Sequence, residues 1–110
     1  MSGKPVVPRV RARQDIDDAL TYYFREAGED VALRFIDALE VAYWHLSPHP
    51  ASGSLRYAYE LDLPGLRVWP LRGFPWLVFY AAADQHVDVW RVLYGSRDIP
   101  TWMGEGLGNE

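Results

Sequence analysis

The chain has 110 residues, no cysteine and a formal net charge of −4, and hydrophobic residues make up 49% of it. This length and apolar content predict one globular domain with its own core, while the missing cysteines exclude disulfides, thiolate metal sites and cysteine nucleophiles. The acidic balance argues against broad nucleic-acid binding, and because no apolar run reaches the ~20 residues of a membrane span and no signal-peptide pattern is present, we expect a soluble cytoplasmic protein without membrane contact.

The first predicted elements are a strand and a helix. Residues 5–13 carry valines around Pro8, and this pattern predicts an edge strand because proline cannot donate to a strand ladder. Apolar residues then recur at helical spacing from Ile16 to Ala27, which predicts an amphipathic helix. Gly28 is placed to end this helix in a left-handed conformation.

A second helix is predicted from about Asp30 up to the prolines at 48 and 50, which cannot continue it. Because only a few residues separate the two helices, we expect them to form an antiparallel αα-hairpin. Residues 47–54 are rich in proline, serine and glycine without periodicity and are interpreted as a loop.

Four strands are predicted in the second half of the chain. Residues 55–61 alternate as a strand does, Pro64-Gly65 fits a type II turn, and residues 66–71, 76–82 and 86–94 continue as an antiparallel meander. Asp98 is placed to cap a short final helix. We expect residues 1–103 to form the single domain and residues 104–110 to be a disordered tail.

The order of elements, β-α-α-β-β-β-β, predicts an α+β fold in which the αα-hairpin packs on a mainly antiparallel sheet. The last two strands carry bulky side chains on both faces, since Val87, Val89 and Leu93 alternate with Trp90, Val92 and Tyr94. The helices cover only one face of such a sheet. We therefore expect the other face to be open to a protein partner.

The charges are distributed unevenly. Eight acidic residues stand against three arginines between positions 13 and 49, whereas positions 54–98 hold five of each sign, all the bases there being arginine. Arginine mixed with tryptophan is typical of recognition surfaces. The competing interpretation is an arginine preference of the genome.

No cofactor and no metal is predicted. Phosphate loops, dinucleotide fingerprints and hydrolase motifs are absent from the sequence. His45 and His49 lie four residues apart with Pro48 between them, which argues against a shared metal-binding face. The acidic cluster of Asp15, Asp17 and Asp18 is interpreted as favourable electrostatics at the start of a helix, in preference to acid/base chemistry.

One set of residues suggests an enzyme. Arg67, Arg72 and Arg91 fall on or between neighbouring strands, and Tyr94 follows the last of them. Arginines stabilise a phosphate transition state and a tyrosine can transfer a proton, so these four residues would suit a metal-independent ribonuclease. The favoured alternative is that the arginines lie on a protein-binding face or pair with acidic residues, of which Glu60, Asp62 and Asp88 are the candidates.

Phrases distributed over residues 5–103 resemble the ParE branch of the RelE/ParE toxin superfamily. They include Asp18-Ala19 with Tyr22-Tyr23, then Pro50 in the loop, and they are followed by a longer set in the strands. The longer set comprises Leu63-Pro64-Gly65-Leu66-Arg67, Phe74-Pro75, Val78-Phe79-Tyr80, Arg91-Val92-Leu93, Gly95 and Arg97-Asp98-Ile99.

The resemblance implies a toxin of the plasmid-stabilisation type that inhibits DNA gyrase by binding and is neutralised by a ParD-like antitoxin encoded beside it. RelE-like relatives, which cleave mRNA on the ribosome, are typically rich in lysine, whereas this chain has only Lys4. Trp76 and Tyr94 depart from the common ParE wording, with tyrosine and histidine frequent at those positions. Ribonuclease activity, or a degenerate toxin that only binds its antitoxin, stays open as an alternative.

We expect the antitoxin tail to contact the two helices and the open sheet face. We also expect gyrase to contact the last strand and residues 97–102. Aromatic and arginine residues dominate binding energies at protein interfaces. The predicted partner-binding residues are Arg67, Trp69, Arg72, Trp76, Trp90, Arg91, Tyr94 and Arg97.

Overall fold

The computed structural model describes residues 3–96 and 98–107, together with the side chains of those residues up to 104. Within this part of the chain eight elements follow one another. They are β1 (Val6–Pro8), α1 (Val10–Glu26), α2 (Glu29–Leu46), α3 (Arg56–Leu61), β2 (Arg67–Pro70), β3 (Trp76–Ala82), β4 (Val87–Tyr94) and α4 (Ile99–Leu107).

The strands form one mixed sheet in the order β1-β4-β3-β2. β1 pairs in parallel with β4, with Val6 opposite Val87, whereas the pairs β2–β3 and β3–β4 are antiparallel. β1 and β2 are therefore the edge strands, as the proline in each allows. The predicted edge strand is confirmed but short: α1 begins at Val10, so that residues 10–13 belong to the helix.

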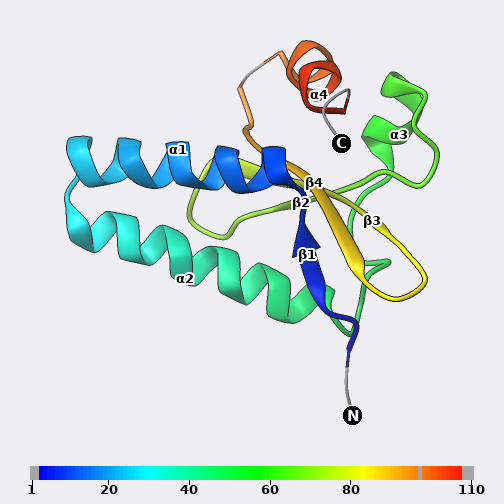
Figure 1. Cartoon of the computed structure of the whole chain (residues 1–110), viewed down its shortest axis with the longest axis horizontal. Helices are drawn as coiled ribbons and strands as arrows, with labels where there is room; N and C mark the ends of the chain where they lie inside the picture. The colour runs from blue at the N-terminus through cyan, green and yellow to red at the C-terminus, as the bar shows by residue number, and fades with distance from the viewer. Residues whose placement is uncertain (1–2, 97, 108–110) are drawn as a thin grey trace.

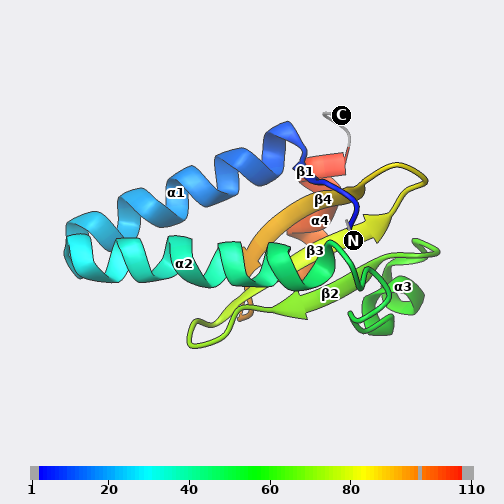
Figure 2. The same cartoon turned by 90° about the horizontal axis from the view of Figure 1, so that it is seen from below.

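The predicted αα-hairpin is confirmed. α1 and α2 run antiparallel along one face of the sheet, and the turn that joins them lies at the far left of both views (Figures 1 and 2). At this turn Gly28 adopts a φ of 96°, which a side chain with a Cβ disfavours. The larger apolar cluster lies between hairpin and sheet and includes Ala19, Phe35, Leu46 and Val78, all fully or almost fully buried.

The second face of the sheet is not open, contrary to the prediction. α3 and α4 lie against it (Figure 1), and they close a second apolar cluster that contains Tyr57, Phe79, Leu93 and Met103. α4 also runs further than expected. Residues 104–107 of the predicted tail continue this helix, and residues 108–110 lie outside the described residues.

Residues 55–61 were predicted to be a strand, and this was wrong. Residues 56–61 form α3 instead, and Asp62 directly after it adopts a left-handed conformation with a φ of 54°. Tyr57 and Leu61, one helical turn apart, pack into the second cluster, while Tyr59 remains 88% exposed. A run of only seven residues with alternating apolar side chains fits both a short strand and two helical turns. The helix is favoured here because it buries Tyr57 and Leu61 on one side while Tyr59 faces solvent.

β4 contains a β-bulge that the sequence pattern did not reveal. Phe79 pairs with Arg91 and the next residue, Tyr80, pairs with Val89, so that Trp90 is left between them. A bulge shifts the residues after it to the opposite faces. Val89 and Leu93 were predicted to share a face, yet Val89 lies in the first cluster and Leu93 in the second.

Candidate functional site

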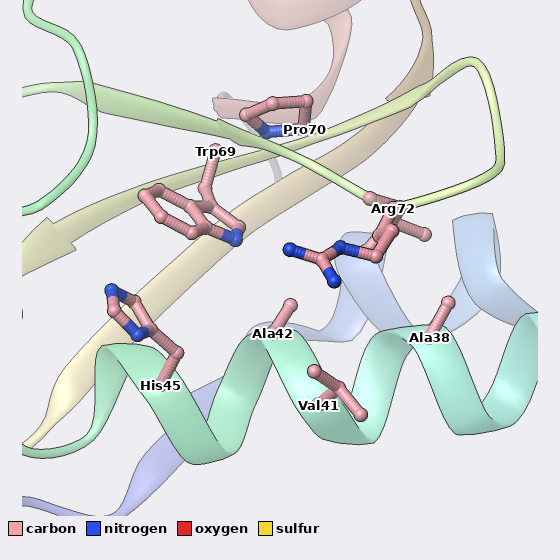
Figure 3. A pocket seen from close by; sticks show the side chains of 8 residues that line it. Ala38, Val41, Ala42, His45, Trp69, Pro70 and Arg72 are labelled. Atoms are coloured by element: carbon pink, nitrogen blue, oxygen red, sulfur yellow. The ribbon is translucent and has the colours of Figure 1, made fainter.

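One concave surface of the protein is a groove between α2 and the edge strand β2. It encloses about 390 Å³ and is lined by Val41, Ala42 and His45 on one side and by Trp69 and Arg72 on the other. Figure 3 shows Trp69 and Arg72 reaching from the β2 side toward α2, while Pro70 points away. We call this the α2–β2 groove. Its walls are largely apolar, and the guanidinium of Arg72 lies between Trp69 and Ala42 (Figure 3).

The exposed side of α2 extends this surface. Trp44 is 81% exposed and Val41 is 59% exposed, and both line an adjoining hollow of about 410 Å³ together with Asp37 and Glu40. Large apolar side chains that stand in water beside a groove are typical of a surface that another protein covers. The α2–β2 groove is therefore the candidate binding site.

A ring stack joins the two sides of the groove. The imidazole of His45 stacks on the indole of Trp69, with ring centroids 4.7 Å apart and an interplanar angle of 17°. The rings of His45 and His49 lie with their centroids 5.4 Å apart, although Pro48 stands between the two residues in the sequence. His45 Nε2 lies 3.1 Å from Ser52 Oγ. Among the described residues no group of three or more histidine, aspartate or glutamate side chains is placed to hold a metal ion.

Arg67, the first of the predicted site residues, holds a loop. Its Nη1 donates to the carbonyl oxygens of Ala51 and Gly53 at 3.1 and 2.8 Å. The opposite residue Tyr80 donates its hydroxyl to Pro50 O at 2.7 Å and accepts from Gly53 N. Burial raises the pKa of Tyr80, although the hydrogen bond to Gly53 and the charge of Arg67 act in the other direction. These contacts attach the loop after α2 to the sheet.

Arg91 is fully buried and forms an internal ion pair. Its Nε and Nη2 donate to the two carboxylate oxygens of Asp15 at 2.7 and 2.8 Å, and its Nη1 donates to the carbonyl oxygen of Trp102. Asp15 Oδ2 also accepts from the backbone N–H of Val92 at 3.0 Å. Arg91 thus joins α1 and α4 to β4, and its guanidinium does not face solvent.

The interpretation of Asp15 as a helix-start residue is wrong. α1 begins at Val10 and has no acidic residue in its first turn. The acidic partners proposed for the arginines also differ from those observed: Asp88 pairs with Arg9 at 2.9 Å, and Asp15 pairs with Arg91.

The remaining predicted residues lie at different places. Trp76 is buried, and its indole meets the ring of Tyr94 edge to face with centroids 5.4 Å apart. Trp90 is half-buried, donates its indole N–H to Asp88 and lies under the guanidinium of Arg9. Arg97 lies outside the described residues.

The structure does not bring together the four residues of the ribonuclease alternative. Arg67 lies at the loop before α3, Arg72 at the α2–β2 groove and Arg91 in the interior between α1 and α4. Tyr94 lines a different cavity, beside Trp76. A phosphate cannot contact all four side chains in this arrangement.

Of the eight predicted partner-binding residues, Trp69 and Arg72 line the α2–β2 groove. Sequence reasoning expected contacts with the two helices but singled out no residue on the α2 side of this site. A signal was present: Val41 and Trp44 fall outside the buried stripe of Phe35, Leu39 and Ala42, so a helical projection places them in solvent.

An αα-hairpin on one face of a small mixed sheet, with a largely apolar groove beside the edge strand, defines a small α+β domain suited to binding another protein. Residues 6–99 match the family of the ParE toxin of type II toxin–antitoxin system, parDE. The chain therefore belongs to the ParE toxin family, and it is the toxin of a type II toxin–antitoxin system. The resemblance noted in the sequence is confirmed.

The fold agrees with a solved structure. A chain from the "Chromosomal ParDE TA system from P. aeruginosa" is similar, with a TM-score of 0.67 and 18% sequence identity, over 81% of this chain and 92% of that chain. At this identity the likeness concerns the fold, and it confirms the predicted α+β class. No curated protein sequence matches the chain. In the described part, none of the helices is long and apolar enough to cross a membrane.

Proposed function

We propose that this ParE toxin inhibits DNA gyrase by binding, without catalysis, and that a ParD-like antitoxin neutralises it by docking in the α2–β2 groove. The observation that carries the proposal is the family match over residues 6–99. Because DNA gyrase is a cytoplasmic enzyme, this target implies that the toxin acts in the cytoplasm.

The chemistry of the α2–β2 groove supports the antitoxin part of the proposal. Val41 and Trp69 offer apolar and aromatic surface from two elements, and Trp44 beside them is almost fully exposed. An amphipathic segment laid between α2 and β2 would bury this surface, as in the helix-in-groove mode of peptide recognition. Arg72, which also lines the groove, suits an acidic residue of that segment.

The environment of Arg91 supports a toxin that acts by binding. Nε and Nη2 of Arg91 already donate to Asp15, and the third nitrogen, Nη1, donates to the carbonyl oxygen of Trp102. Pulling this guanidinium out to meet an RNA phosphate would leave the Asp15 carboxylate buried without its partner, which is costly.

Two assays with the purified chain test the target. The chain is titrated into a gyrase supercoiling reaction and, in parallel, into a translating extract whose mRNA is followed by primer extension. We expect supercoiling to be lost while the message remains intact. Cut message with normal supercoiling would replace the proposal with a ribosome-dependent ribonuclease, and no effect in either assay would point to a degenerate toxin that serves only as an antitoxin-binding module.

A groove variant tests the antitoxin part separately. Val41→Glu places a charge on the exposed side of α2 without touching the core, because Val41 is 59% exposed. We expect this variant to inhibit supercoiling as the wild type does but to resist rescue by the ParD-like antitoxin encoded beside it. Rescue at the wild-type antitoxin concentration would place the antitoxin elsewhere on the toxin.

A further inference from the structure

A second cavity lies on the opposite side of the hairpin, between α1 and the strands β3 and β4. It encloses about 530 Å³ and is lined by Asp18, Tyr22, Tyr23, Trp76 and Tyr94 together with two small residues. We call it the aromatic cleft. Its volume falls in the ~300–1,000 Å³ range of small-ligand sites. Trp76 and Tyr94 were predicted to contact a partner, and here they are joined by residues of α1.

The rings of the cleft form a continuous chain of edge-to-face contacts. Tyr22 meets Tyr23 at 70°, Tyr23 meets Trp76 at 63°, and Trp76 meets Tyr94 at 86°, with centroids 5.4 to 6.5 Å apart. Four aromatic side chains thus line one cleft, and an aromatic ring attracts a cation that lies over its face.

The cleft is also pre-formed and negatively charged. Trp76 donates its indole N–H to the hydroxyl of Tyr23 at 2.8 Å, so the two rings hold each other in place. Asp18 supplies a carboxylate at the rim, where Gln14 Nε2 donates to one of its oxygens at 2.9 Å. Among the described residues that line the cleft, none is basic.

We propose that the aromatic cleft binds an arginine side chain presented by a protein partner. A planar guanidinium stacks on ring faces and forms paired hydrogen bonds to a carboxylate, and both kinds of group are present here. An apolar side chain would cover the Asp18 carboxylate without supplying a donor, which costs free energy. The more strongly hydrated ammonium of lysine stacks less well on aromatic rings. The site is independent of the α2–β2 groove and of the gyrase assignment.

The test is a titration followed by nuclear magnetic resonance with N-acetylarginine methylamide as the probe. The indole N–H signal of Trp76, assigned by its absence in Trp76→Phe, reports on the cleft. We expect a saturable shift of this signal. N-acetylcitrulline methylamide has the same shape without the charge, and we expect it to leave the signal in place. A shift of equal size with citrulline, or no saturable shift with arginine, overturns the proposal.

Matched variants localise the effect. Asp18→Asn removes the rim charge, and because an exposed ion pair contributes little, we expect the arginine affinity to fall about two- to fivefold. Asp17→Asn is the control, since this neighbouring carboxylate is exposed but does not line the cleft. Tyr94→Leu removes a ring and is expected to weaken binding about two- to fivefold, whereas Tyr94→Phe keeps the ring and the affinity. Two results would overturn the assignment to a guanidinium. One is an equal loss of arginine affinity in Asp17→Asn and Asp18→Asn, and the other is that N-acetyllysine methylamide binds as tightly as the arginine probe.

Discussion

Asp15 and Arg91 meet in the interior through two parallel hydrogen bonds of 2.7 and 2.8 Å, although 76 positions separate them in the chain. The pair lies where β1 has ended and β4 still has a free edge. There the Asp15 carboxylate takes the place of a neighbouring strand by accepting the N–H of Val92. The bulge at Trp90 precedes Arg91 directly, and we infer that it turns the guanidinium toward α1 and α4.

Removal of one partner of this pair should destabilise the protein strongly. In Arg91→Ala the Asp15 carboxylate stays buried without its counter-charge, and such losses cost about 3–5 kcal/mol. Urea unfolding measures the change. The double variant Asp15→Leu/Arg91→Met removes both charges and should lose much less than the sum of the two single losses. If Arg91→Ala unfolds at the wild-type urea concentration, the pair has no structural role.

The packing of the αα-hairpin on one face of the sheet could be predicted because both helices carry long, regular apolar stripes. The other face could not be predicted. α3 is only six residues long, and its covering partner α4 lies at the end of the chain among glycines that suggested a disordered tail. A short element is fixed by what it packs against, here Phe79 and Leu93, and this information is not local.

The candidate site was predicted only in part for a similar reason. Trp69 and Arg72 stood out by residue type, and they do line the α2–β2 groove. Arg91 stood out equally, yet it is internal because its partner Asp15 comes from a distant helix. Residue type indicates which side chains can bind; the three-dimensional neighbours decide which of them do so at the surface.

Tyr43 should make the protein sensitive to alkaline pH. Its hydroxyl is buried without a hydrogen-bond partner, and burial raises its pKa from 10.0 to about 12. The unfolded chain releases this proton near pH 10, whereas the folded chain keeps it up to about pH 12. The free energy of unfolding therefore keeps its full value below about pH 10, and the titration of Tyr43 lowers it by about 2–3 kcal/mol between pH 10 and 12.

The variant Tyr43→Phe isolates this contribution. It removes a buried hydroxyl that lacks a partner, so we expect it to be as stable as the wild type at pH 7, or more stable by about 1 kcal/mol. Urea unfolding of both proteins from pH 8 to 11.5 should show a shallower alkaline decline in the variant. The raised pKa of Tyr80 adds a decline that both proteins share. Identical slopes would show that Tyr43 titrates alike in the folded and unfolded states.

Two glycines should respond oppositely to alanine. A Cβ at Gly53 would lie 2.7 Å from Tyr80 Oη and 2.9 Å from Val68 O, where the loop meets the sheet. Gly53→Ala should therefore cost about 1–3 kcal/mol through overpacking. Gly104 lies in α4 with open space around it, and Gly104→Ala should stabilise the protein by about 0.5–1 kcal/mol. Thermal unfolding of the two variants against wild type checks the difference in sign.

Trp44 and Tyr59 offer a matched test of where the antitoxin binds. Both are aromatic residues on helices and both are almost fully exposed, at 81% and 88%, but Trp44 extends the α2–β2 groove while Tyr59 lies on α3. If the antitoxin covers the groove, Trp44→Ala should weaken its affinity at least about tenfold, because tryptophans at the centre of an interface carry much of the binding energy. Tyr59→Ala should bind as the wild type does.

Isothermal titration calorimetry with the ParD-like antitoxin measures both variants. Neither side chain contributes to the two apolar clusters. The free energy of unfolding of each variant should therefore stay within ~0.5 kcal/mol of the wild type, as for ordinary surface substitutions. A loss of affinity in Trp44→Ala alone therefore reports on the interface and not on the fold. A loss confined to Tyr59→Ala would move the antitoxin to the α3 side and remove the support that the α2–β2 groove gives to the proposed mode of neutralisation.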